Sequence, residues 1–123
     1  MEKLEINKEF WKNKRILLTG HTGFKGSWLT LWLKKLGSNI TGFSKDIPTT
    51  PSLFELSEIK NDIDSILGDL RNFNDVKNII HEKKPEIIIH MAAQSLVPIS
   101  YKNPRETFET NVMGTVNLLE SIR

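Results

Sequence analysis

The chain has 123 residues, of which 38% are hydrophobic and 26% are charged, a composition that describes one soluble globular domain and excludes a disordered chain or two full domains. Its formal net charge is +2. The basic excess falls in a leader over residues 1–14, whereas the following domain over residues 15–123 is nearly neutral, which disfavours a nucleic-acid partner.

The residue types that are missing exclude several kinds of chemistry. Without cysteine the chain has no disulfide, no thiolate metal site and no cysteine nucleophile, and this lack suits a cytoplasmic protein. The first 14 residues contain acids and lack the apolar stretch of a signal peptide. The longest apolar runs are far shorter than the ~20 residues of a membrane span, so no membrane partner is expected.

The first predicted elements alternate between strand and helix. Residues 15–19 are a short, branched apolar run that a glycine follows at once, which is typical of a buried parallel strand. A glycine-rich turn then precedes a helix predicted over 27–37 and ended by Gly37, and a second strand is predicted over 39–43. The helix face expected to pack on the sheet is apolar and contains Trp28, Leu29, Trp32, Leu33 and Leu36.

The middle of the chain is less regular. Residues 44–51 are rich in turn formers, and 52–64 are interpreted as a short helical turn or an irregular loop. A third strand is predicted over 66–70, and the spacing of apolar residues predicts a helix over 72–82 that ends before Pro85. The β-branched run at 86–93 predicts a central fourth strand.

The last predicted element is a helix that begins at Asn103 and continues to the end of the chain. Asn103 is the expected N-cap, followed by Pro104 at the first helical position and Glu106 at the third. One side of this helix is apolar and carries Phe108, Val112, Val116 and Leu119. Strands that alternate with helices predict an α/β fold with a parallel sheet covered on both faces.

The turn after the first strand carries the pattern G-x-x-G-x-x-G, at Gly20, Gly23 and Gly26. Backbone N–H groups and the positive end of the next helix favour an anion at such a turn, and glycine lets a ligand approach closely. The first spacing is one residue wider than in the common fingerprint, but the position between strand and helix predicts dinucleotide binding rather than a simple tight turn. A Walker A loop is excluded, because Lys25 is followed by glycine rather than by serine or threonine.

Four short motifs resemble those of the extended short-chain dehydrogenase/reductases: TGHTGFKGS at 19–27, GDLR at 68–71, HMAAQ at 90–94 and TNVMGT at 110–115. Within that family, the strings at 21–33, 48–55 and 91–97 are most similar to the dehydratases that act on CDP-glucose. The resemblance covers the chain from about Phe10 onward. It implies the N-terminal half of a Rossmann-like, doubly wound parallel sheet with strand order 3-2-1-4, truncated before the catalytic segments.

The resemblance also implies which residues meet the cofactor. The three glycines, the backbone of Phe24 and Lys25 and the turn at 21–22 are expected beside the pyrophosphate. Asp69 and Leu70 match positions that meet the adenine, with Asp69 accepting from the exocyclic amine. Further cofactor contacts are expected at Met91, Ala92, Ala93, Gln94 and Thr110, and the substrate side is expected at Gln94 and Ser95.

The resemblance favours NAD as the cofactor, although one position departs from the family pattern. NAD-dependent relatives place an acid at the end of the second strand to hold the ribose 2'-hydroxyl. Here that position is Ser44, followed by Lys45 and Asp46. Asp46 could bend toward the ribose, or Ser44 and Lys45 could accommodate a 2'-phosphate, so NADP stays open.

A second departure concerns the catalytic residues. Relatives use a Tyr-x-x-x-Lys pair and a Ser/Thr-Asp-Lys/Glu group beyond the last helix, whereas the only tyrosine here is Tyr101, with Arg105 four residues later. No catalytic residue is therefore expected in this chain, which should be inactive alone. The intact protein is expected to be a lyase that converts CDP-glucose to CDP-4-keto-6-deoxyglucose through transient hydride transfer to bound NAD and loss of water. The alternatives are a non-catalytic dinucleotide-binding module and another nucleotide-sugar dehydratase or epimerase.

The remaining features have structural interpretations. The three histidines, His21, His81 and His90, lack the spacing of metal ligands, so no metal is expected. Sheet packing is favoured over base stacking for the two helical tryptophans. The last helix has a second stripe that is less polar than a solvated face, made of Asn111, Thr115, Leu118 and Ile122. The resemblance implies that the intact protein is a homodimer that uses this helix. The alternative is that the stripe packs against a later helix.

Overall fold

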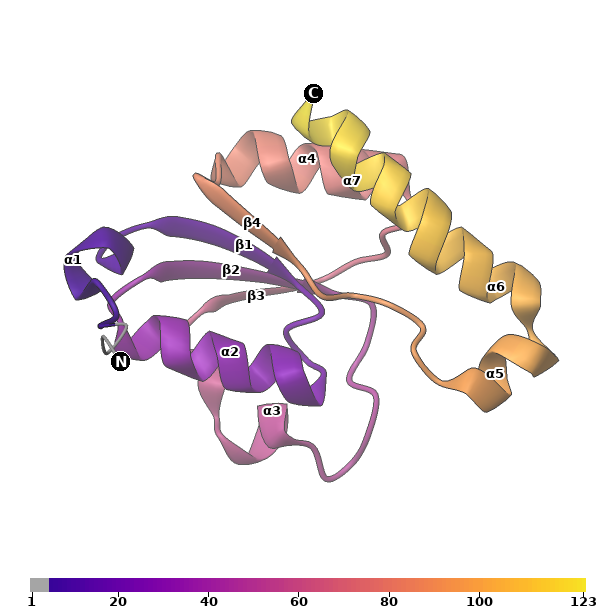
Figure 1. Cartoon of the computed structure of the whole chain (residues 1–123), viewed down its shortest axis with the longest axis horizontal. Helices are drawn as coiled ribbons and strands as arrows, with labels where there is room; N and C mark the ends of the chain where they lie inside the picture. The colour runs from indigo at the N-terminus through magenta and orange to yellow at the C-terminus, as the bar shows by residue number, and fades with distance from the viewer. Residues whose placement is uncertain (1–4) are drawn as a thin grey trace.

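The computed structural model describes residues 5–123 and contains one parallel sheet of four strands. The strands are β1 (Arg15–Thr19), β2 (Asn39–Ser44), β3 (Asp64–Leu67) and β4 (Ile87–His90), in the order β3-β2-β1-β4 (Figure 1). Because β1 pairs with both β2 and β4, Leu18 lies between Gly42 and Ile89 in register. The predicted strand order 3-2-1-4 is confirmed.

Helices cover both faces of the sheet. In Figure 1, α2 and α3 lie on one face, and α4 and the long C-terminal helical segment lie on the other. The helical elements are α1 (Lys8–Trp11), α2 (Phe24–Lys35), α3 (Leu53–Leu56), the 3₁₀ helix η1 (Ile59–Asn61), α4 (Phe73–Lys83), α5 (Val97–Lys102), α6 (Pro104–Phe108), the π-helix η2 (Glu109–Met113) and α7 (Gly114–Ile122).

Two apolar clusters fill the two layers between sheet and helices. Successive residues of a strand point to opposite faces. On the α2 side, Leu33 packs against alternate strand residues that include Ile16 and Leu18. On the α4 and α7 side, Leu17 joins a cluster that is completed by Phe43, Leu70, Val76, Ile79 and Leu118. The strands are therefore buried from both sides, as their continuous apolar runs predict.

The predicted sheet-facing side of α2 is right for Leu29 and Leu33, which pack on the sheet, but wrong for the two tryptophans. Trp28 and Trp32 are 56% and 52% exposed, whereas Ser27 and Thr30 are fully buried. The small residues let the helix approach the sheet closely, and their hydroxyls are satisfied locally. Thr30 donates to the Gly26 carbonyl at 2.7 Å and Ser27 to the His21 carbonyl at 2.9 Å. A polar residue that bonds to nearby backbone is inexpensive to bury.

Several boundaries also differ from the predictions. The third strand is Asp64–Leu67 rather than 66–70, and the fourth ends at His90 rather than 93. The Met91 N–H still donates to the Thr19 carbonyl and hydroxyl, both at 3.1 Å. The fourth strand ends there because the Ala92 N–H turns to the hydroxyl alone, at 3.2 Å. The loop predicted around Pro98 contains α5, with Pro98 near its start. The leader contains α1, whose Trp11 packs against the cluster on the α2 side.

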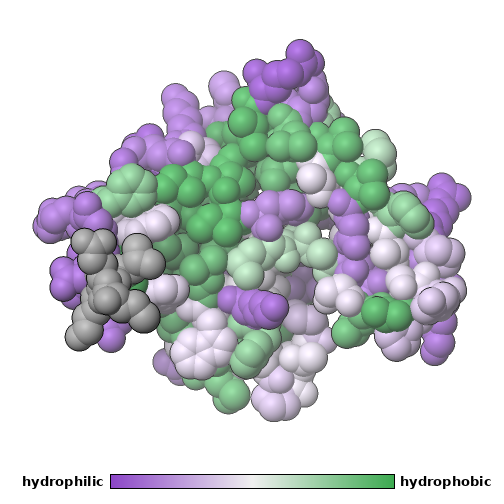
Figure 2. Space-filling view, in the orientation of Figure 1, coloured by the Kyte–Doolittle hydropathy of each residue, from purple (hydrophilic) through white to green (hydrophobic). Residues whose placement is uncertain are grey.

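The C-terminal helical segment packs on the rest of the protein through its less apolar stripe, and its most apolar stripe faces outward. Leu118 is 3% exposed and packs on α4, and Thr115 and Asn117 of the same face make hydrogen bonds inward. The other stripe is largely exposed: Phe108, Val112, Val116 and Leu119. Figure 2 shows apolar surface over this segment and over the sheet edge at β4, whose four residues are half-buried.

Candidate functional site

The loops that follow the strands meet at one edge of the sheet. The strand order reverses at β1, because β2 lies on one side of it and β4 on the other. The crevice beside the carboxyl ends of the strands at such a reversal is where open α/β sheets bind ligands. The loops after β1 and β4 touch here, since a Cβ atom on Gly20 would lie 2.8 Å from the Ala92 backbone nitrogen.

Two of the three motif glycines are required by the chain itself. Gly20 has φ +80°, and its N–H donates to the Phe43 carbonyl at 2.8 Å, which fixes the loop to β2. A Cβ atom on Gly26 would lie 2.0 Å from the Gly20 carbonyl oxygen. Both positions therefore need glycine for a tight turn and for close contact between helix and loop.

At position 23, by contrast, neither backbone conformation nor packing within the chain requires glycine. Its φ is −73°, and an added Cβ would meet only the Gly20 carbonyl oxygen, at 3.4 Å, an ordinary contact. Gly23 is the N-cap of α2, and the N–H groups of the first helical turn have no partner inside the helix. The next residue, Phe24, is 70% exposed. The bare surface at Gly23 thus fits an anion that contacts the backbone directly.

His21 supports this loop from beneath. Its ring is fully buried and bonds the hydroxyls of Ser44, the last residue of β2, at 2.9 Å and of Ser65, within β3, at 2.7 Å. Gly42 of β2 makes room for the ring, because a Cβ there would lie 2.3 Å from a ring carbon. Burial lowers the pKa of His21 from 6.5 to about 4. His21 is therefore neutral at pH 7, and it faces the protein interior.

Ser44 is the last residue of β2 and is 5% exposed. Besides its contact with His21, its hydroxyl accepts from the Thr22 N–H at 3.4 Å. The Asp46 carbonyl accepts from the Thr22 hydroxyl at 2.6 Å, so this loop is fastened through its backbone. The end of β2 consequently directs its serine toward the loop interior, and the exposed residue that follows is Lys45.

The segment after β3 carries a charged pair. Arg71 donates to both oxygens of Asp69, with the shortest distance, 2.6 Å, between Nη2 and Oδ2. The Arg71 side chain holds the pKa of Asp69 below its ordinary value, and Asp69 in turn raises the pKa of Arg71. The Arg71 backbone N–H also donates to Asp69 Oδ1 at 2.9 Å. An ionised carboxylate has about four lone-pair sites, so the three N–H groups of Arg71 leave about one of them for a ligand amine. Leu70 is buried in the core, where its carbonyl accepts from Asn117 at 2.8 Å.

The loop after β4 is held by the C-terminal helical segment. Asn111 accepts from the Gln94 N–H at 2.8 Å and donates to the Gln94 carbonyl at 2.9 Å. The Gln94 side chain donates to the Thr107 hydroxyl at 3.0 Å. Asn111 lies in the π-helix η2, beside the half-buried Thr110. π-helical turns are frequent at functional sites, and here the turn aims an amide at the loop.

The remaining expected residues of this loop lie along the same crevice. His90 contacts the Thr19 hydroxyl at 2.6 Å and the Thr115 hydroxyl at 3.1 Å, and burial lowers its pKa. Met91 and Ala92 are half-buried over Thr19, whereas Ala93 and Ser95 are exposed. The expected residues on the loops after β1 and β4 are thus brought to one crevice.

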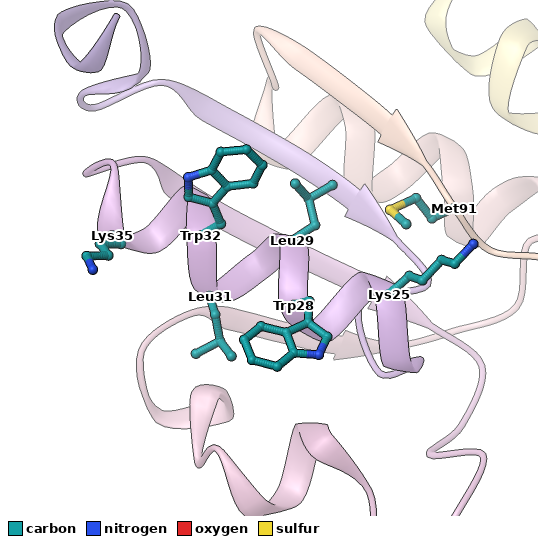
Figure 3. Close-up of a pocket in the computed structure, with 7 residues that line it drawn as sticks. All are labelled: Lys25, Trp28, Leu29, Leu31, Trp32, Lys35 and Met91. Carbon is teal, nitrogen blue, oxygen red and sulfur yellow. The ribbon is translucent and has the colours of Figure 1, made fainter. Parts of the chain in front are cut away.

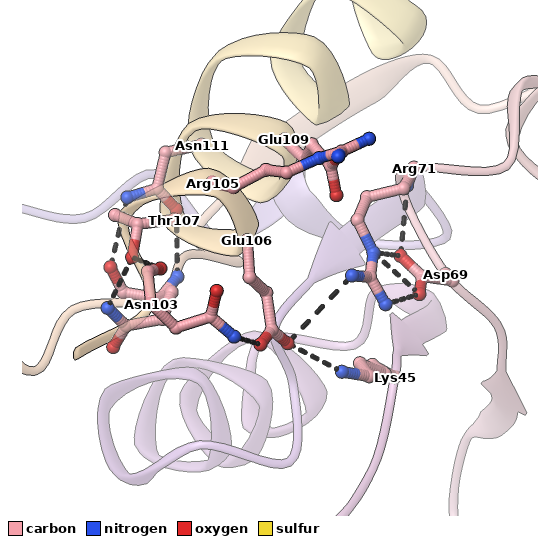
Figure 4. Close-up of polar contacts among 10 residues, drawn as sticks. Lys45, Asp69, Arg71, Asn103, Arg105, Glu106, Thr107, Glu109 and Asn111 are labelled. Carbon is pink, nitrogen blue, oxygen red and sulfur yellow. Dashed lines mark hydrogen bonds and ion pairs between the residues drawn. The ribbon is translucent and has the colours of Figure 1, made fainter. Parts of the chain in front are cut away.

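A network missed by the sequence reasoning joins the β2 and β3 ends to α6. The Glu106 carboxylate lies 3.2 Å from Lys45 Nζ and 3.8 Å from Arg71 Nη1, and its second oxygen accepts from Asn103 at 2.8 Å (Figure 4). The sequence pattern places Glu106 only at the start of the helix. Asn111 was also missed, although it lies inside the TNVMGT motif. Glu106 carries no local signal, because its partners are 61 and 35 residues away.

An open apolar groove of about 620 Å³ lies along α2 and reaches the crevice at Lys25 and Met91. Figure 3 shows that it is lined by Lys25, Trp28, Leu29, Leu31, Trp32, Lys35 and Met91. Its walls offer little hydrogen bonding, so it does not resemble a phosphate site. Within residues 5–123, no cluster of three or more His, Cys, Asp or Glu side chains is arranged to bind a metal ion. None of the helices in that range is long and apolar enough to cross a membrane.

Comparison with known proteins identifies the family. A family model described as GDP-mannose 4,6 dehydratase matches residues 17–123. The chain belongs to the GDP-mannose 4,6-dehydratase family. CDP-glucose 4,6-dehydratase of Salmonella typhimurium is 54% identical over 118 residues, which make up 96% of this chain and 33% of that protein. CDP-paratose 2-epimerase of Salmonella typhi is 37% identical over 89% of this chain and 32% of its own length.

Solved structures of nucleotide-sugar epimerases share the fold of this family member. The Thermus thermophilus UDP-glucose 4-epimerase, in complex with NAD, aligns with a TM-score of 0.77 and 29% identity over 87% of this chain and 33% of that one. The Thermotoga maritima UDP-glucose 4-epimerase, with UDP-glucose, aligns with a TM-score of 0.78 and 25% identity over 87% of this chain and 33% of that one. The chain therefore spans about a third of the length of its relatives, and it matches a Rossmann-like dinucleotide-binding fold.

Proposed function

We propose that this chain is the N-terminal, NAD-binding part of a nucleotide-sugar 4,6-dehydratase that converts CDP-glucose to CDP-4-keto-6-deoxyglucose. The observation that carries the proposal is the 54% identity to CDP-glucose 4,6-dehydratase along 96% of the chain. That identity extends over the glycine loop, the loop after β4 and the start of the C-terminal helix. The proposed activity belongs to the intact protein, of which the chain supplies the cofactor side.

The geometry of the loop after β1 supports dinucleotide binding. The pyrophosphate would rest on Gly23 and the first turn of α2, where a side chain is absent without a packing reason and helix N–H groups are available. Lys25, exposed on the same turn, adds a positive charge. The adenine would lie toward Asp69, whose carboxylate stays ionised at neutral pH beside Arg71.

The loop after β4 would position the nicotinamide side and the sugar. Bound NAD would supply the reversible hydride acceptor that oxidation at C4 of the sugar and reduction at C6 require. The contribution of this chain is to orient the reactants: Asn111 fixes Gln94 through two backbone hydrogen bonds, and Ser95 follows it at the exposed end of the loop. Such preorganised loops lower the entropic cost of bringing reacting atoms together.

The proposal includes a homodimeric, cytoplasmic enzyme. An exposed apolar stripe runs along three successive helical elements, α6, η2 and α7, and consists of Phe108, Val112, Val116 and Leu119. Such a stripe is typical of an interface. The absence of cysteine from the sequence is consistent with a reducing compartment.

A substrate panel tests the proposed activity. The intact protein, supplied with NAD, is incubated separately with CDP-glucose, dTDP-glucose, UDP-glucose and GDP-mannose, and products are followed by NMR. Loss of the C6 hydroxymethyl signal and growth of a methyl signal from CDP-glucose alone is the expected result. Turnover of another sugar nucleotide, or epimerisation without a methyl signal, would identify a different member of the family. NAD binding without turnover of any of the four would support a non-catalytic module.

A further inference from the structure

The end of β2 lacks the carboxylate that usually selects NAD. An acid about 20 residues beyond the glycine motif binds the ribose 2'-hydroxyl, whereas a nearby arginine accommodates the 2'-phosphate of NADP. Here the position holds Ser44, whose hydroxyl faces His21 in the interior. The cationic side chains near this point are those of Lys45, which is exposed, and Arg71, which is partly exposed. The exposed residue after Lys45 is Asp46, whose backbone carbonyl is held by the Thr22 hydroxyl. Taken alone, these two cations would favour a 2'-phosphate.

A carboxylate reaches the same place from another element. Glu106 projects from α6 over the ends of β2 and β3 and lies between the two cations, as Figure 4 shows. Its position is not a chance rotamer, because the Asn103 amide donates to its second oxygen at 2.8 Å. Lys45, Arg71 and Asn103 thus hold Glu106 from three directions.

The charges of this network leave little attraction for an added phosphate. Asp69 already engages Arg71 at 2.6 Å, so that the two cations face two carboxylates. A 2'-phosphate that entered beside Lys45 would meet the Glu106 carboxylate within a Debye length of about 10 Å at 0.1 M salt, and it would have to compete for both cations. A ribose 2'-hydroxyl would meet a hydrogen-bond acceptor instead.

We propose that Glu106 is the residue that selects NAD over NADP in this protein, taking the place of the missing acid at the end of β2. This inference rests on the proposed dinucleotide function and concerns the ribose end of the same site. Glu106 neutralises Lys45 and Arg71 and presents its own negative charge where the 2'-phosphate would bind. The selecting carboxylate is therefore supplied by a helix about 60 residues further along the chain.

Isothermal titration of NAD and of NADP into the intact protein tests this assignment. In Glu106→Gln, NADP affinity is expected to rise about tenfold while NAD affinity changes less than threefold, and the gain should shrink between 50 and 300 mM salt. Adding Lys45→Met to that variant should remove most of the gain. Glu120→Gln, which makes the same change of net charge on α7 beside Arg123, is the matched control and should change neither affinity.

A further variant covers a failure of Glu106→Gln to fold, which circular dichroism would detect. Asn103→Ala keeps the Glu106 carboxylate but removes the hydrogen bond that holds it, and a smaller rise in NADP affinity is expected. Unchanged NADP affinity in the folded variants, or wild-type protein that binds NADP as tightly as NAD, would overturn the inference alone. Wild-type protein that binds neither dinucleotide would overturn the proposed function, and this inference with it.

Discussion

The buried His21 ring should make the folded state sensitive to mild acid. Its pKa is about 4 in the folded chain and 6.5 when the ring is in water. As pH falls, the unfolded chain takes up the proton first, so stability is lost progressively from pH 6.5 toward pH 4. A difference of 2.5 pKa units corresponds to about 3 kcal/mol when complete, of which about 2 kcal/mol is already lost at pH 5. Most carboxylates are still ionised at that pH, so they contribute little above it.

The assay is urea unfolding of the intact protein at several pH values between 7.5 and 5. His21→Gln keeps a side chain that can both donate and accept but removes the titration, and it should flatten the pH dependence by about 2 kcal/mol. His90, whose pKa is lowered in the same direction, accounts for a residual slope. His81→Gln, at an exposed position on α4, is the matched histidine control. A His21→Gln profile as steep as that of the wild type would refute the reasoning.

Three further predictions concern the glycine loop, the loop after β4 and the exposed stripe. Gly23→Ala should lower the unfolding free energy by less than about 1 kcal/mol, because alanine is a poorer N-cap than glycine, yet it should weaken NAD binding at least tenfold by titration. Gly26→Ala should lower the unfolding free energy by about 1–3 kcal/mol; equal effects of the two on stability would contradict the separate roles. Asn111→Ala should speed amide hydrogen exchange at Gln94 and cost about 1–3 kcal/mol, because two backbone groups lose their partner; unchanged exchange would show that the loop is held elsewhere. Leu119→Glu, at a 61% exposed position, should convert a dimer to a monomer in light scattering without lowering monomer stability; an unchanged mass would place the interface elsewhere.

The order of elements could be predicted from the sequence because it depends on local patterns. The strand at Arg15–Thr19 is a continuous apolar run with a glycine after it, and it was placed with its bounds correct. The face of α2 was predicted only in part. Leu33 is buried as expected, but amphipathic spacing treats Trp28 as core and Ser27 as surface. In the fold the reverse holds, since closeness to the sheet requires small residues and the serine hydroxyl finds a carbonyl partner six residues back.

In the candidate site, too, local patterns could be predicted from the sequence and contacts made by the fold could not. The glycine turn is encoded within seven residues, and both its position and the bare surface at Gly23 follow from that pattern. The inward orientation of Ser44 depends on His21, 23 residues earlier, and on the space that Gly42 leaves for the ring. Glu106 reaches Lys45 only because the sheet order brings α6 over the end of β2. Contacts that topology creates leave no trace in local spacing.

Isotope transfer within the sugar tests the central claim most directly. The intact protein is incubated with NAD and with CDP-glucose that carries deuterium at C4, and the product is analysed by NMR. The expected product is CDP-4-keto-6-deoxyglucose in which the deuterium has moved to the C6 methyl group. Absence of that product, or a methyl group whose added hydrogen comes from solvent, would contradict the claim.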